Sequence, residues 1–185
     1  MNNPLRFRDK MDVSVEANKR HAAGIKLNFH WEFECLDKHG KLKWTEEGDN
    51  LIVNTGLDDA LDKWLKGSGY TAAFYVGLTD GTPTVAAGDT MASHAGWAEV
   101  TAYDEATREV LTLGTVSSQS VDNSASKASF TIDTNSTTVG GGFITTNSTK
   151  GGTSGTLISA KAFTAADKSL DDDDVLNVTV TITAS

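Results

Sequence analysis

Apolar and polar residues alternate strictly from residue 25 to residue 35, and this pattern constrains the fold more than any other in the chain. The apolar positions are Ile25, Leu27, Phe29, Trp31, Phe33 and Cys35. Side chains of an extended strand point alternately to its two faces, so a period of two predicts a long strand with one buried face. We therefore expect these side chains, Trp31 and Phe33 included, to lie together in a core.

The rest of the chain is expected to form mostly short strands separated by turns. Residues 37–40, Asp-Lys-His-Gly, predict a turn into a return strand at 41–44, followed by a polar loop at 45–50. Further strands are expected at 51–53, 72–78, 96–103, 110–113, 127–132, 139–145, 156–163 and 175–183, with loops at 117–126 and 145–155. Many short strands with frequent turns predict a mainly all-β fold, a β-sandwich or jelly roll.

One short amphipathic helix is expected at residues 56–66. Its apolar side chains are Leu57, Leu61, Trp64 and Leu65. They fall at i, i+4, i+7 and i+8, which places them on one helix face. Asn54 or Thr55 is expected to cap the N-terminus of the helix, and Gly67 its C-terminus. A helix of about three turns is marginal alone, so we expect it to pack on the β-body.

Charge divides the chain into a weakly basic N-terminal arm and an acidic body. The net charge is -9, and residues 1–50 hold nine basic and nine acidic side chains, so the excess acid lies in residues 51–185. We expect an extended arm at residues 1–23 and a single β-rich domain at residues 24–185. We also expect the arm to contact a neighbouring acidic subunit. Its candidate contact residues are Arg6, Arg8, Lys10, Lys19 and Arg20.

Composition argues against several classes of protein. An acidic chain lacks the clustered Lys and Arg that nucleic acid requires, so no nucleic-acid partner is expected. No apolar run approaches the roughly 20 residues of a membrane span, and the N-terminus lacks the apolar stretch of a secretory signal. The single cysteine, Cys35, excludes an internal disulfide framework.

Motifs for catalysis or metal binding are sparse. The histidines show no metal-ligand spacing, there is no Gly-x-Ser-x-Gly elbow, and residues 140–142, Gly-Gly-Gly, lack the Lys and Ser/Thr of a phosphate loop. The acidic run Asp171–Asp174 is expected to be a solvated, metal-free turn, with a calcium site as the alternative. We therefore expect no catalytic residue, cofactor or metal, and no enzymatic activity.

A carbohydrate- or receptor-binding module is the alternative from a different class. Aromatic side chains exposed in a row on a sandwich could stack on sugar rings, and Trp44, Trp97 and Tyr103 are the candidates. We expect all three to fill the core instead. Their exposure in the structure separates the two interpretations.

Residues 74–81, Phe-Tyr-Val-Gly-Leu-Thr-Asp-Gly, and the following residues 83–99 resemble the virion structural proteins of tailed bacteriophages. Residues 50–57 and 176–181 resemble the same group, so the resemblance runs through most of residues 50–183. It implies a non-enzymatic virion component assembled in the host cytoplasm, with capsid decoration or cement as the first role. A head–tail, collar, tail or fibre-adaptor position is the alternative. The implied partners are the major capsid protein or other virion subunits, with copies of this chain forming a homo-oligomer on the particle.

Overall fold

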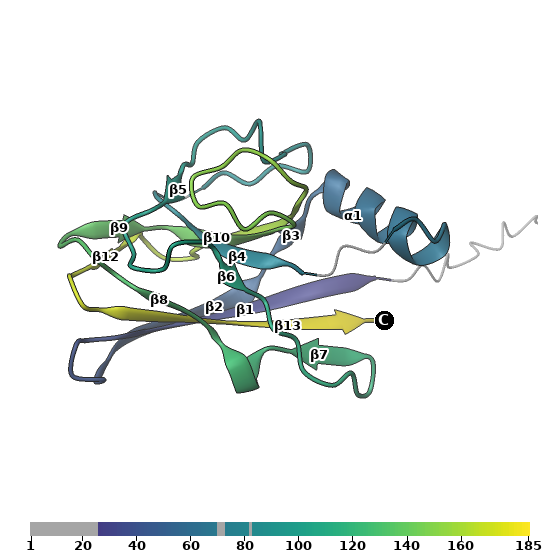
Figure 1. The fold of residues 1–185 in the computed structure, drawn as a ribbon. Helices are drawn as coiled ribbons and strands as arrows, with labels where there is room; N and C mark the ends of the chain where they lie inside the picture. The colour runs from purple at the N-terminus through teal and green to yellow at the C-terminus, as the bar shows by residue number, and fades with distance from the viewer. Residues whose placement is uncertain (1–25, 70–72, 82) are drawn as a thin grey trace, which may run out of the picture.

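The structure, a computed structural model, describes residues 26–69, 73–81 and 83–185. Two antiparallel sheets share one hydrophobic core, and a short helical segment lies at the end of the sandwich where the first strand begins (Figure 1). The predicted all-β, sandwich-like class is therefore confirmed.

The first sheet is built around two long strands from opposite ends of the chain. Its strands are β2 (Leu42–Asp49), β1 (Leu27–Leu36), β13 (Val175–Ala184), β7 (Ser120–Asp122) and β8 (Ala128–Thr131). β1 pairs with β13 along its whole length, from Leu27 opposite Ala184 to Leu36 opposite Val175. β7 and β8 both pair with the other side of β13. The alternation that predicted β1 and β13 also aligns their buried residues on one face.

The second sheet consists of β3 (Leu51–Ile52), β11 (Leu157–Ala162), β10 (Gly141–Thr145), β4 (Tyr75–Thr79), β5 (Glu99–Val100) and β6 (Glu109–Val110). A separate ribbon pairs β9 (Thr137–Val139) with β12 (Lys168–Leu170). The helical segments are α1 (Asn54–Ala60), the π-helical turn η1 (Leu61–Leu65) and the 3-10 turn η2 (Ser124–Ser126).

The core between the sheets confirms the expectation drawn from the period-two pattern. Trp31 is fully buried and Phe33 is 1% exposed. Their rings stack with centroids 5.7 Å apart, and Phe33 meets Phe163 edge to face at 4.9 Å. Phe163 follows β11, so this aromatic cluster joins the two sheets.

Several details of the strand prediction are wrong: β12 was not expected, and only residues 99–100 and 109–110 are strands where 96–103 and 110–113 were predicted. Residues 45–49 continue β2 instead of forming a loop, because an edge strand with one solvent-facing side accepts charged residues such as Glu47. The expected loop at 117–126 contains β7 and η2. The expected strand at 139–145 is divided into β9 and β10, because the chain changes partners at Gly140.

A buried ion pair with no local sequence signal fixes a long polar loop to the second sheet. Arg108 is fully buried and makes two hydrogen bonds to the carboxylate of Glu99, at 2.8 and 2.7 Å. Its remaining donors reach the carbonyl oxygens of Asn147, at 2.8 Å, and Gly152, at 2.6 Å. The guanidinium therefore holds the Ser/Thr/Gly-rich loop after β10 in place.

Candidate functional site

The helical segment is attached to the sandwich through its small residues. Gly56 is the only buried residue of α1, and a Cβ built on it would lie 2.2 Å from the carbonyl oxygen of Ile158. The hydroxyl of Thr55 donates a hydrogen bond to the carbonyl oxygen of Leu157 at 2.8 Å. Helix and strand β11 therefore approach closely only because position 56 has no side chain.

Replacing Gly56 by Ala is expected to destabilise the protein by roughly 1–3 kcal/mol, because the new methyl group forces the helix away from β11. The matched control is Gly69→Ala, at a position where an added Cβ meets nothing within 4 Å. Urea unfolding of both variants measures the difference. Equal midpoints for the two variants would show that the contact between α1 and β11 is looser than described.

The apolar residues of the helical segment face solvent, which corrects the orientation expected from the sequence. The exposed fractions are 43% for Leu57, 56% for Leu61, 63% for Trp64 and 68% for Leu65. We call these four residues the outer stripe. The helix does pack on the body, but through Gly56, which lets its backbone approach β11 more closely than a large side chain would permit. The expected side-chain cap is also absent: Val53 is the N-cap residue and contributes no side-chain hydrogen bond.

The C-terminal end of the helical segment matches the sequence expectation more closely. The last helical turn is π-helical, with the N–H of Lys66 bonded to the carbonyl oxygen of Leu61. Gly67 follows at φ +76°, the left-handed conformation that suits glycine at a helix C-terminus.

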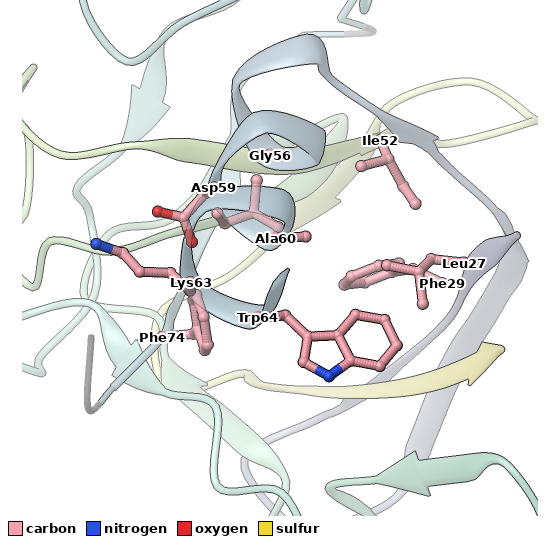
Figure 2. Close-up of a pocket in the computed structure, with 10 residues that line it drawn as sticks. Leu27, Phe29, Ile52, Gly56, Asp59, Ala60, Lys63, Trp64 and Phe74 are labelled. Atoms are coloured by element: carbon pink, nitrogen blue, oxygen red, sulfur yellow. The ribbon is translucent and has the colours of Figure 1, made fainter. Parts of the chain in front are cut away.

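An apolar groove lies between the helical segment and the ends of the two sheets (Figure 2). Its main cavity, of about 360 Å³, is lined chiefly by Leu27, Phe29, Ile52, Trp64, Phe74 and Ile158. An adjoining cavity of about 270 Å³ is lined by Leu27, Ala60 and the outer stripe. Leu27 and Trp64 line both cavities, so the groove and the outer stripe form one continuous apolar surface. Continuous exposed apolar surface of this kind is typical of surfaces that bind proteins or ligands.

Acidic side chains border this apolar surface. Asp58, Asp59 and Asp62 line a shallow depression on the helical segment, and Asp59 also lines the main cavity. Lys66 donates a hydrogen bond to Asp62 at 2.9 Å, which holds the pKa of that carboxyl below its usual value. Lys63 also lines the main cavity, and both Lys63 and Lys66 pair with Asp62, so the border has a small net negative charge from Asp58 and Asp59. Such a border favours a ligand that combines apolar groups with a small excess of basic ones.

The histidines, the cysteine and the acidic side chains are the residues whose chemistry could serve metal binding or catalysis. Among the described residues, no group of three or more His, Cys, Asp or Glu side chains is placed to hold a metal ion. His30 pairs with Asp49 at 3.0 Å, and His94 stacks on Trp97. Cys35 is buried, and its burial raises the pKa of the thiol to about 12, so it is protonated at neutral pH.

The acidic run after β12 is only partly the solvated turn that was expected. Asp171, Asp172 and Asp173 are exposed, but Asp174 is 3% exposed. Its carboxylate accepts hydrogen bonds from the backbone N–H of Asp171, at 2.7 Å, and from the ammonium group of Lys43. The expectation was wrong for Asp174 because a turn carboxylate that binds its own backbone and a lysine can be buried without a metal.

Millimolar calcium is expected to leave the melting temperature unchanged, because Asp174 already has its partners. An ion bound only by the folded state at 100 times its Kd would add about 2.7 kcal/mol. In a domain of this size that is a rise of several degrees. Thermal scans with calcium and with EDTA measure the effect, and a rise of that size with calcium would contradict the assignment.

The aromatic side chains proposed for sugar stacking are not exposed in a row. Trp97 is 7% exposed and Tyr103 1% exposed. Trp44 is half-buried, with its ring edge-to-face against Phe163 at 5.7 Å. The expectation that these rings fill the interior is confirmed for Trp97 and Tyr103, and the exposed tryptophan is Trp64 instead.

The remaining predicted site residues lie outside the described part of the chain. These are Arg6, Arg8, Lys10, Lys19 and Arg20. The helical pattern predicts the outer stripe but favours an interior position for it, and no local pattern indicates that Leu27 lines the groove.

Comparisons with known proteins leave the family open. No protein-family model matches the chain, and neither a curated protein nor a solved structure is significantly similar to it. No helix among the described residues is long and apolar enough to cross a membrane.

Proposed function

We propose that this protein is a non-enzymatic structural protein of a tailed-bacteriophage virion, and that it binds and stabilises the capsid shell as a decoration or cement protein. The single observation that carries a binding role is the outward-facing apolar stripe beside an apolar groove. An isolated monomer gains nothing from Trp64 and Leu65 in solvent, whereas a subunit of an assembly buries such a surface against its neighbours.

The assignment to a virion rests on the sequence resemblance of residues 50–57, 74–99 and 176–181. The rigid body supports a contact role, since the Arg108–Glu99 pair and the aromatic core fix the surface on which partners would dock. The proposed partners are the major capsid protein, other virion subunits and further copies of this chain. Many identical contacts on a symmetric particle would hold the protein even if each contact is weak.

Deleting residues 1–23 is expected to leave the body folded with a similar melting temperature but to abolish or strongly reduce incorporation into particles. The reason is that the basic arm supplies contacts to an acidic neighbour, each worth roughly 0–1 kcal/mol and effective only in number. Particles made with the truncated gene are purified, and the occupancy of the protein is measured by quantitative mass spectrometry.

A full-length control separates the effect of removing the basic charges from the effect of removing the segment itself. In this control Arg6, Arg8, Lys10, Lys19 and Arg20 are all replaced by Gln. Intermediate occupancy is expected for the control, because backbone and apolar contacts of the arm remain. Normal occupancy of the truncated protein would show that the arm is dispensable and that the body alone makes the attachment.

A further inference from the structure

The apolar groove opens at the point where the described chain begins. Lys26 is still part of the first sheet, since its N–H bonds to the carbonyl oxygen of Ser185 at 2.7 Å and its carbonyl oxygen accepts from the N–H of Ser185 at 2.9 Å. The next residue, Leu27, lines both cavities. The described chain therefore begins beside the groove, with Lys26 fixed to the C-terminal residue Ser185.

The 25 residues before Lys26 have the chemistry that this surface requires. Their sequence has apolar side chains at Leu5, Phe7, Met11, Val13 and Val15. Arg6 and Arg8 alternate with the first two of these, and Lys10 follows. Residues 1–25 hold five basic and three acidic side chains, and this small basic excess complements an apolar groove bordered by Asp58 and Asp59. Fully extended, such a segment spans roughly 80 Å, which is enough to reach a neighbouring molecule.

We infer that the apolar groove and the outer stripe are the docking site for the N-terminal segment, residues 1–25, of a second copy of this chain. Leu5 and Phe7 of one copy insert beside Trp64 and Leu27 of the other, and Arg6 and Arg8 face the acidic border. Exchange of this segment between copies buries the outer stripe and links subunits directly. The inference rests on the proposed structural role and names one of its partners.

The experiment uses two full-length variants of the isolated protein. The arm variant carries Leu5→Ser and Phe7→Ser and keeps an intact groove, whereas the face variant carries Trp64→Ser and Leu65→Ser and keeps an intact arm. Wild-type protein is expected to associate with itself in sedimentation equilibrium. Each variant alone is expected to associate at least about tenfold more weakly, as the loss of buried apolar side chains requires.

Mixing the variants is the decisive step. A tagged arm variant is expected to retain the untagged face variant, because the intact groove of the first accepts the intact arm of the second, while it does not retain other arm-variant molecules. Unchanged melting temperatures show that both variants are folded. A mixture that stays monomeric, or wild-type protein that is monomeric at every concentration, would overturn the inference.

Docking of the N-terminal segment on the groove of its own molecule would give a different experimental result. If wild-type protein is monomeric but the arm variant alone increases quenching of Trp64 fluorescence by iodide, the segment covers its own groove and exchange between copies is refuted. These measurements involve no particles. The protein could therefore associate with itself and still fail to load onto particles. That result would contradict the virion role and leave the docking of the N-terminal segment standing.

Discussion

Replacing Arg108 by Ala is expected to lower the free energy of unfolding by about 3–5 kcal/mol, the usual cost of removing one partner of a buried pair. Arg108 is fully buried, and its loss leaves the carboxylate of Glu99, 8% exposed, without its cation. The carbonyl oxygens of Asn147 and Gly152 lose their donors at the same time. The loop after β10 should then detach from the second sheet.

The matched control is Lys66→Ala, which removes an exposed ion pair to Asp62 on the helical segment. That variant is expected to cost at most about 0.5 kcal/mol. Urea unfolding of both variants and of Glu99→Gln measures the contrast, and the double variant should cost less than the sum of the two single ones. An Arg108→Ala variant as stable as the control would contradict the buried pair.

The variant Phe33→Ala is expected to cost roughly 3–5 kcal/mol, because it empties the centre of the aromatic cluster that joins the two sheets. Trp31 and Phe163 both lose a ring contact. Trp64→Ala is the control, since Trp64 is 63% exposed and its removal should change the free energy of unfolding by no more than about 0.5 kcal/mol. If Phe33→Ala lowers the free energy of unfolding by less than about 1 kcal/mol, β1 is peripheral to the core.

The long strands could be predicted from sequence because their patterns reflect the final burial. Alternation identified β1 and β13, and the turn at residues 37–40 forms as expected, with the carboxylate of Asp37 accepting hydrogen bonds from the N–H groups of His39 and Lys41. Local signals sufficed because both strands have one face in the core and one in solvent.

The outer stripe could be located from sequence, but its orientation relative to the body could not. An amphipathic pattern shows that Leu57 and Trp64 share a helix face, but it does not show which face meets the body. Here Gly56 decided the orientation, because backbone atoms of Ile158 in β11 leave no room for a Cβ at that position. A glycine inside a helical pattern was the available signal of this close packing.

Long-range polar pairs were beyond the reach of any local pattern. Lys43 and Asp174 are 131 positions apart in sequence, and Arg108 holds a carbonyl oxygen 44 positions away. Nothing in the neighbourhood of either residue indicates its partner. No local pattern predicts the groove either, because the residues that line it, such as Leu27, Trp64 and Ile158, come from three separate segments of the chain.

The most direct test of the structural role is a comparison of virus particles produced with and without this gene, imaged by electron cryo-microscopy. The account predicts that the protein co-purifies with the particle, and that its deletion removes density repeated symmetrically over the outer surface of the head. Particles that lack the protein altogether when purified from wild-type infections, with identical maps for the two preparations, would contradict it.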